Sequence, residues 1–196
     1  AMLLPGDERL YRILEKQKKE YTLTICGRDG KDQTYQIGSL IELIWGIENP
    51  AAIINKIADK NIHIITLTIT EGGYNIAKAT NEFMLDNENI KYDLAHPQSP
   101  KTTFGFVAEG LRKRKAVGNG PITILSCDNL QHNGNTARKA FLSFFQAQDP
   151  ELAEWATVNI TFPNSMVDRI TPSTQPEDII RLNTQNGTQD GAPVYC

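Results

Sequence analysis

The chain has 196 residues, 40% of them hydrophobic and 22% charged, a composition typical of a globular protein large enough to bury a core. Its net charge of −3 gives no general attraction to nucleic acid or anionic lipid, and no apolar run approaches the roughly 20 residues of a transmembrane helix. The three widely spaced cysteines argue against a disulfide framework and favour a reducing, cytoplasmic compartment, and no spacing of cysteines and histidines indicates a metal site.

The first third of the chain predicts a short helix, a β-hairpin and two further helices. Residues 6–20 carry an apolar stripe at helical spacing. Two alternating runs, 21–27 and 33–38, flank the turn sequence GRDGKD and are typical of a hairpin. Short helices are expected at 39–46 (SLIELIWG) and at 50–60, where a proline fits the first helical turn.

From residue 63 onward, apolar strand-like runs alternate with helical patterns. HIITLTIT (63–70) is expected to be a buried strand that is covered on both faces. It is followed by a helix at about 101–117, a strand at 122–126, a helix from about 133 with an apolar face of Ala and Phe, and a strand at 157–165. This order predicts an α/β fold with a mainly parallel sheet flanked by helices.

The tail of the chain, about 171–196, is rich in Asn, Gln, Thr and Asp. It is therefore expected to be irregular until a short final strand in APVYC. No strong boundary precedes this tail, so residues 1–196 are interpreted as one domain.

Three of the predicted strands end in polar clusters: TEGGY (70–74), SCDNL (126–130) and FPNSMVDR (162–169). Ligands of parallel α/β sheets bind outside the carboxyl ends of the strands, so these clusters are expected to form one site. Cys127 is interpreted as a small packing residue rather than a nucleophile, because nothing in the sequence places a histidine beside it. The basic run at 112–115 is interpreted as the solvated end of a helix, not as a nucleic-acid site.

Several polar residues at these strand ends have two interpretations each. Asn129 can donate a hydrogen bond to an oxygen on which charge develops, as in the reduction of a ketone, or it can cap the next helix, which the spacing alone favours. Asp168 and Arg169 can bind a polyhydroxylated substrate or form a structural ion pair, and the residues leave both open. Gly72 and Gly73 permit close approach of a ligand or form a simple turn.

Taken together, LTITEGGY (67–74), SCDNLQHNG (126–134) and FPNSMVDRITP (162–172) resemble the long-chain polyol dehydrogenases, the mannitol dehydrogenase family. DLAHPQSPKTTFGF (93–106) is most similar to the mannitol 2-dehydrogenase branch. The resemblance implies a Rossmann-like NAD-binding domain in a metal-independent oxidoreductase. Such an enzyme moves hydride between NAD and a sugar alcohol or ketose, here mannitol and fructose.

The same resemblance implies roles for residues at matching positions. Asn129 matches the asparagine that helps to bind the reacting oxygen, and Asp168 matches an acid that contacts the substrate's hydroxyl groups. Asn164 and Arg169 lie in the same motif and are expected beside the substrate.

The cofactor is expected to contact two further stretches. Asp7 matches the acid that hydrogen-bonds the adenosine ribose, which favours NAD over NADP. Gly6 stands where the family often has a second acid, so NADP stays as the alternative cofactor. Thr70, Glu71 and Gly72 match the turn on the nicotinamide side.

Two parts of the family pattern do not occur in residues 1–196. There is no glycine-rich GxGxxG turn, and there is no counterpart of the helical C-terminal domain that carries the catalytic lysine. The chain is therefore expected to be a partial nucleotide-binding domain that lacks its first strand–helix–strand and is inactive by itself. Loss of that strand would expose a sheet edge, through which a homodimer of the chain is expected.

Two alternatives remain at this point. Within the family, the parent protein can instead be a fructuronate (mannonate) reductase or another sugar-acid reductase. In a different class, the chain can be a non-catalytic association module. Neither nucleic acid nor a membrane is expected as a partner.

Overall fold

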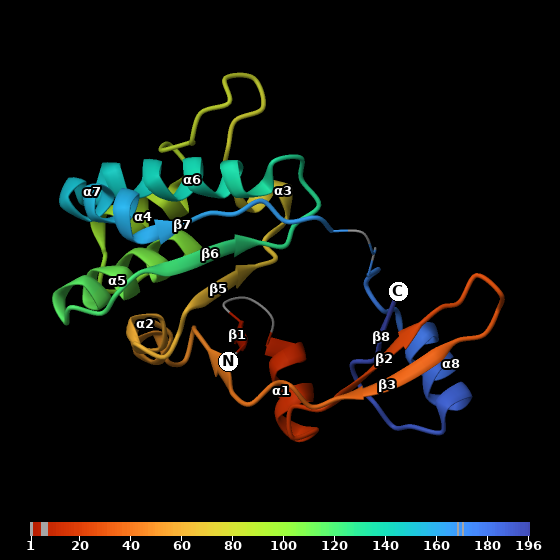
Figure 1. The fold of residues 1–196 in the computed structure, drawn as a ribbon. Helices are drawn as coiled ribbons and strands as arrows, with labels where there is room; N and C mark the ends of the chain where they lie inside the picture. Colours follow the sequence, from red (N-terminus) through yellow and green to blue (C-terminus); the bar gives the residue numbers. More distant parts are fainter. Residues whose placement is uncertain (1, 5–7, 168, 170) are drawn as a thin grey trace. The chain divides into compact units, whose positions relative to one another are not determined.

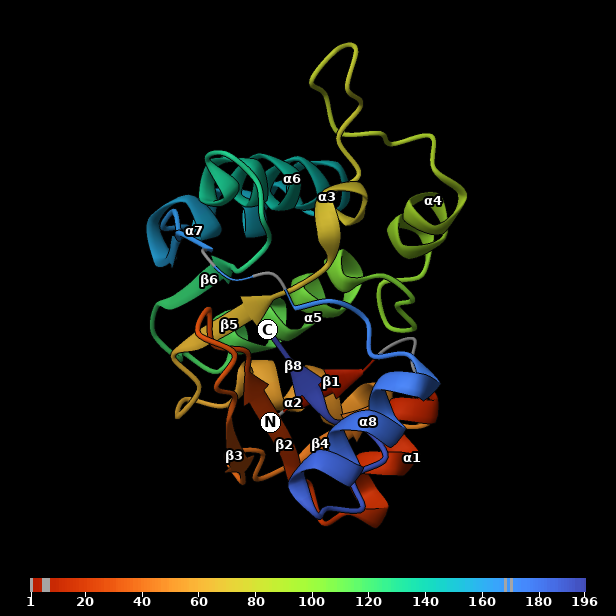
Figure 2. The ribbon, with the colours of Figure 1, turned by 90° about the vertical axis from the view of Figure 1, so that its right-hand side faces the viewer.

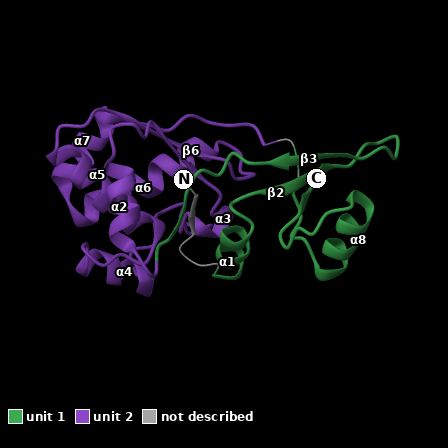
Figure 3. Ribbon diagram, turned by 90° about the horizontal axis from the view of Figure 1, so that it is seen from below, with its two compact units in different colours: residues 1–46, 168–196 green, residues 47–167 purple. Residues whose placement is uncertain are grey.

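The structure is a computed structural model that describes residues 2–4, 8–167, 169 and 171–196 (Figure 1). The chain divides into two compact units, which Figure 3 colours separately. Unit 1 comprises residues 1–46 and 168–196, and unit 2 comprises residues 47–167.

Unit 1 is built from two segments that are far apart in the sequence. Its elements are β1 (Met2–Leu4), α1 (Glu8–Lys16), β2 (Tyr21–Ile25), β3 (Gln33–Ile37), β4 (Leu43–Trp45), α8 (Pro176–Asn186) and β8 (Val194–Tyr195). Strand β2 is central in the sheet β3-β2-β8, antiparallel to β3 and parallel to β8. The buried carboxylate of Asp190 joins the two segments, because it accepts hydrogen bonds from Thr22 N (2.6 Å) and from Gln17 Nε2 (2.9 Å). The predicted hairpin and the final strand are confirmed.

Two predictions in unit 1 are wrong. Residues 39–46 do not form a helix, because Leu43–Trp45 form β4, which pairs in parallel with β1. The tail is not irregular throughout, because α8 occupies its middle. Pro176 at the first turn and a capping box between Gln175 and Asp178 start this helix, and Gly187, at φ 64°, ends it.

Unit 2 contains a three-stranded parallel sheet (Figures 1 and 2). Its elements are α2 (Pro50–Ala58), β5 (Ile64–Leu67), α3 (Thr70–Gly73), α4 (Glu88–Ala95), α5 (Thr103–Ala116), β6 (Ile122–Ser126), α6 (Asn133–Gln148), α7 (Pro150–Asn159) and β7 (Ile160–Thr161). The strand order is β5-β6-β7, and both pairings are parallel. Helix α6 lies along one face of this sheet (Figures 1 and 2). The predicted α/β fold, with a parallel sheet, flanking helices and a hairpin, is confirmed.

The core of unit 2 follows the predicted apolar face of α6. The side chains of this face are fully buried: Ala137, Ala140, Phe141, Phe144 and Phe145. The aromatic rings pack in tilted, stacked and edge-to-face contacts; the Phe104 and Phe141 ring centroids, for example, lie 4.9 Å apart. On α5, Gly110 permits close packing of α2, because a methyl group there would come within 2.5 Å of Ile57.

Several details of unit 2 differ from the prediction. The basic run at 112–115 is not a solvated helix end throughout, because Arg114 is buried and donates to the backbone oxygens of Ile57 and Asp59. Strand β5 is not covered on both faces, since Ile64 is 56% exposed. Residues 157–159 belong to α7, and β7 keeps two residues of the strand predicted at 157–165. An Asp149 cap and a proline at the first turn start α7, which then runs up to the strand. Helix α4, which Asn87 caps, was not predicted.

Candidate functional site

The carboxyl ends of β5 and β6 are joined by a buried polar cluster of Tyr74, Ser126 and Asp128. The Tyr74 hydroxyl lies 2.6 Å from Ser126 Oγ and 2.7 Å from Asp128 Oδ2. All three residues are buried. Buried polar groups destabilise a fold unless they are hydrogen-bonded. Removal of any one of the three side chains would therefore leave another without its partner and weaken the connection between the two strand ends.

The single hydroxyl proton of Tyr74 fixes the direction of these bonds. The Asp128 carboxylate can only accept, so Tyr74 donates to it and Ser126 donates to Tyr74. Burial raises the pKa of Tyr74 far above its ordinary value; the Ser126 bond opposes this effect, and Asp128 adds to it. Tyr74 is therefore a neutral donor at any ordinary pH, not a base.

Asp128 also holds the turn that follows β5. Its Oδ1 accepts from Thr70 N (2.8 Å), and its Oδ2 accepts from Ile69 N (3.2 Å). Thr70 has φ 64°, a left-handed conformation that β-branched residues rarely adopt. Strain of this kind persists where surrounding contacts impose it, and it clusters at ligand sites.

The segment after β7 is held against the start of α6. Asn133 Nδ2 lies 2.8 Å from Ser165 Oγ and 3.2 Å from Ser126 O, and Asn133 Oδ1 accepts from Ser165 N (2.9 Å). At Gly134 a methyl group would come within 2.4 Å of the carbonyl oxygen of Pro163. The predicted convergence of the three strand ends is therefore present inside unit 2.

Asn129 and Asn164 have different surroundings at these strand ends. Asn129 is exposed, and within the described ranges its side chain has no hydrogen-bond partner. Asn164 Oδ1 accepts from Gly134 N (2.9 Å) and Asn135 N (3.3 Å), so this oxygen already caps α6.

The predicted cofactor turn is open to solvent. Glu71 forms an exposed ion pair with Lys78 (3.2 Å), and a methyl group at Gly72 would meet no atom within 4 Å. Arg169 lies in unit 1, where its guanidinium is 3.7 Å from Cys196 Sγ. Asp7 and Asp168, predicted at the ribose and at the substrate hydroxyls, lie outside the described residues.

Cys127 fits its predicted packing role. Its backbone N–H donates to Leu67 O (2.8 Å) and so continues the β5–β6 ladder. Burial and the charge of Asp128 raise the pKa of the Cys127 thiol, which disfavours the thiolate that a nucleophile needs. Sequence reasoning missed Tyr74, Ser126 and Asn133, although a Ser at the last position of an apolar strand was a signal for a buried hydrogen bond.

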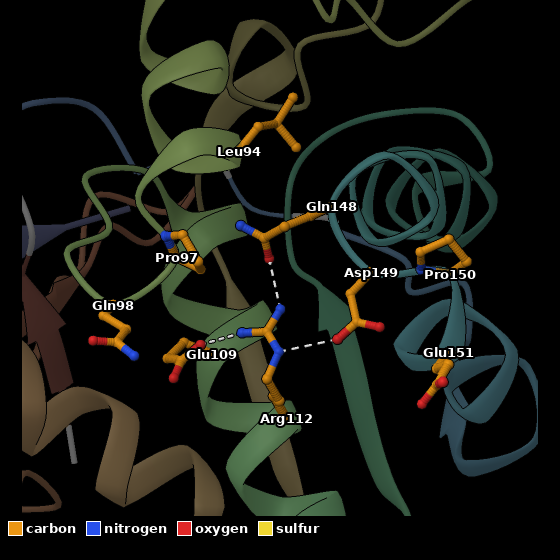
Figure 4. A pocket seen from close by; sticks show the side chains of 9 residues that line it. All are labelled: Leu94, Pro97, Gln98, Glu109, Arg112, Gln148, Asp149, Pro150 and Glu151. Carbon is orange, nitrogen blue, oxygen red and sulfur yellow. Dashed lines mark hydrogen bonds and ion pairs between the residues drawn. The ribbon is translucent and has the colours of Figure 1, made fainter.

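A cavity of about 490 Å³ lies at the other end of α6, away from the strand tips (Figure 4). Four of its polar side chains form one network, because the Arg112 guanidinium contacts Glu109, Asp149 and Gln148. Burial alone would raise the pKa of Asp149, but the Leu152 N–H and Arg112 outweigh this and hold that pKa below its usual value. The charged groups around Arg112 are thus explained by a structural network that joins α5 to the end of α6.

The described part of the chain holds neither a cluster of metal ligands nor a membrane-spanning helix. No three histidine, cysteine, aspartate or glutamate side chains gather there as metal ligands would. None of the helices in the described ranges is long and apolar enough to cross a bilayer.

Comparisons with known proteins agree on one family. Residues 7–196 match the family described as the mannitol dehydrogenase Rossmann domain. The chain is 44% identical over 196 residues to the polyol:NADP oxidoreductase of Gluconobacter oxydans, a match that covers 98% of this chain and 40% of the relative. It is 38% identical over 197 residues to the D-mannonate oxidoreductase of Escherichia coli (99% and 40%) and 40% identical over 181 residues to the mannitol 2-dehydrogenase of Phaeosphaeria nodorum (92% and 32%).

Solved structures show the same fold. A substrate-free D-sorbitol dehydrogenase matches with a TM-score of 0.94 and 41% identity, over 98% of this chain and 41% of that one. The mannitol 2-dehydrogenase of Pseudomonas fluorescens, in a ternary complex with NAD and D-mannitol, matches with a TM-score of 0.93 and 40% identity, over 99% and 40%. This chain therefore spans roughly 32% to 41% of the length of the proteins it matches.

Proposed function

The chain belongs to the mannitol dehydrogenase family, and from this membership we propose that it is the nucleotide-binding part of an NAD-dependent polyol dehydrogenase that interconverts mannitol and fructose. The observation that carries the proposal is the junction of the β5 and β6 ends. There a strained turn and an exposed asparagine are fixed next to one another by buried Asp128.

These residues suit a nicotinamide cofactor. The turn Thr70–Gly72 has open space above Gly72, so a flat ring can approach the backbone there. When bound, NAD supplies the acceptor for the hydride. Asn129 would donate a hydrogen bond to the reacting oxygen of the substrate, where negative charge develops. No general base is assigned within this chain, and we propose that the chain alone is inactive.

A domain exchange tests the proposal. Residues 7–196 replace the matching part of the Pseudomonas fluorescens enzyme, and NADH formation from mannitol is followed by absorbance. We expect activity from the chimera and none from this chain alone. A chimera that unfolds cooperatively like its parent but forms no NADH with mannitol would overturn the proposal, and NADH formed by the isolated chain would overturn its inactivity.

The choice of cofactor is part of the same proposal. The Pseudomonas structure holds NAD, and the Gluconobacter relative is named for NADP. We propose NAD, on the resemblance at Asp7. The chimera is assayed with both cofactors, and a kcat/KM that is higher for NADP than for NAD would reverse this assignment.

A sugar-acid reductase is the second candidate, because the Escherichia coli relative is a D-mannonate oxidoreductase. A panel of mannitol, sorbitol and mannonate, assayed on the whole protein that contains this chain, separates the two. We further propose a cytoplasmic location and a homodimer of the isolated chain through the outer edge of β5.

A further inference from the structure

We infer that Asp128 is a positioning residue, whose carboxylate holds the turn Thr70–Gly72 in its strained form and fixes it beside Asn129. The inference rests on the proposed function, in which this turn faces the cofactor. Asp128 itself need not touch the cofactor or the substrate. It acts through the backbone of the neighbouring strand end.

The first argument is where the ladder between the strands ends. The last backbone bond between β5 and β6 runs from Cys127 N to Leu67 O (2.8 Å). Beyond it, the N–H groups of Ile69 and Thr70 donate to the side chain of Asp128 instead of to a backbone carbonyl of the neighbouring strand. A side chain has thus taken over the role of the ladder where the chain bends into α3.

The second argument is charge. Asp128 accepts from two backbone N–H groups and from the Tyr74 hydroxyl, and an acceptor-only carboxylate suits three donors. An asparagine has the same shape but presents an NH₂ group on one side. If its oxygen takes the Oδ1 place, the NH₂ faces Ile69 N–H; if it takes the Oδ2 place, the NH₂ faces Thr70 N–H. One backbone donor therefore loses its acceptor in either orientation.

The third argument is strain. Thr70 at φ 64° carries a conformational cost that its hydrogen bond to Asp128 offsets. Without that bond the turn should relax towards negative φ and move Glu71 and Gly72. Glycine at position 70 would remove this cost, so the strain itself can be tested.

The consequence for the reaction is a fixed spacing. Asn129, which would bind the reacting oxygen, follows Asp128 directly in the sequence. The side chain of Asp128 binds the turn that would face the cofactor, so this one residue connects the two parts of the site. The buried Tyr74–Ser126 pair also helps to fix the position of Asp128, because Tyr74 donates a hydrogen bond to the same carboxylate.

The test measures amide hydrogen exchange by NMR in this chain. In Asp128→Asn we expect exchange at Ile69 and Thr70 to accelerate on the order of tenfold to a hundredfold, since a charge-assisted acceptor is lost. Exchange at Asn75, whose N–H donates to Gly72 O (3.1 Å), should accelerate as the turn relaxes. Adding Thr70→Gly to Asp128→Asn should return Asn75 to near its original rate.

Asp93→Asn is the matched control. Asp93 is a second buried carboxylate of unit 2, and it accepts from Lys101 N and Thr102 N, both at 2.8 Å. Its change should lower global stability without selective acceleration at Ile69 and Thr70. If both variants accelerate exchange equally throughout unit 2, or if Thr70→Gly does not restore the exchange rate at Asn75, the positioning role of Asp128 is refuted.

A kinetic readout separates positioning from mere structure. In the chimera, Asp128→Asn should raise the KM for NAD and lower kcat, and Asp93→Asn should leave both near the parent values. Unchanged kinetics with accelerated exchange would refute the positioning role. A folded but inactive chimera would instead count against the proposed function. The exchange experiment would still decide whether Asp128 holds the turn Thr70–Gly72.

Discussion

At the scale of single residues, Asp128 and Asn129 are neighbours at the tip of β6 with different surroundings. Asp128 is buried and accepts hydrogen bonds from three donors, whereas Asn129 is exposed. The sequence predicted a functional strand tip and identified both residues as polar. It assigned Asn129 to the reacting oxygen, but it could not show that Asp128 binds the turn after β5, because the donors to Asp128 come from residues 69–74, more than fifty positions earlier.

Asn129→Ala tests the role proposed for the amide. If Asn129 stabilises charge on the reacting oxygen, kcat of the chimera should fall by roughly a hundredfold to a thousandfold with little change in the KM for NAD. Folding should be unaffected because the side chain is exposed. Asn135→Ala, at an exposed position of α6, is the matched control and should keep full activity. Equal kcat in the two variants would remove Asn129 from the reaction.

At the scale of elements, local patterns were sufficient where the element is defined by its own residues. The hairpin, α2, β6 and α6 lie close to their predicted positions because alternation, a proline at the helix start or an apolar face defines each. Strand β4 was mistaken for a helix because its partner β1 lies some forty residues away. Helix α8 was missed because polar composition outweighed its capping box, and fully buried Leu182 shows that it still packs.

The close contact between α6 and the segment after β7 leads to a stability prediction. Gly134→Ala places a methyl group against the carbonyl oxygen of Pro163. Because this oxygen belongs to the backbone and cannot easily move away, the change should destabilise unit 2 by about 1–3 kcal/mol. Gly120→Ala is the control, since a methyl group there meets no atom within 4 Å. The measurement is the urea midpoint of each variant. Matching midpoints would mean that the α6 contact relaxes freely.

At the scale of the whole chain, the family and the fold class were predictable, because three long motifs lie at strand ends in a fixed order. The division into two units was not predicted. Unit 1 is assembled from both ends of the chain, and contacts between residues some 170 positions apart, such as Thr22 and Asp190, leave no local pattern.

The association of the isolated chain is predicted from β5. It is an outer strand of its sheet, and the backbone oxygens of His63 and Leu67 accept from the neighbouring strand. By alternation, the backbone N–H and C=O groups of Ile64 and Thr66 point to the open edge. We expect light scattering to give a dimer, and Thr66→Lys to give a monomer because charge on an edge strand blocks pairing. Val158→Lys, at a position on α7 that is 83% exposed, should remain dimeric. A monomeric parent chain would contradict the proposal.

The two-segment construction of unit 1 also sets an order of folding during synthesis. Unit 2 is one contiguous stretch, so all its strands are available once residue 167 has left the ribosome. The sheet β3-β2-β8 must wait for residues 194–195, and until then β2 lacks one of its two neighbours. For the whole of that interval the edge of β2 that later binds β8 is unpaired, which exposes unit 1 to aggregation during synthesis.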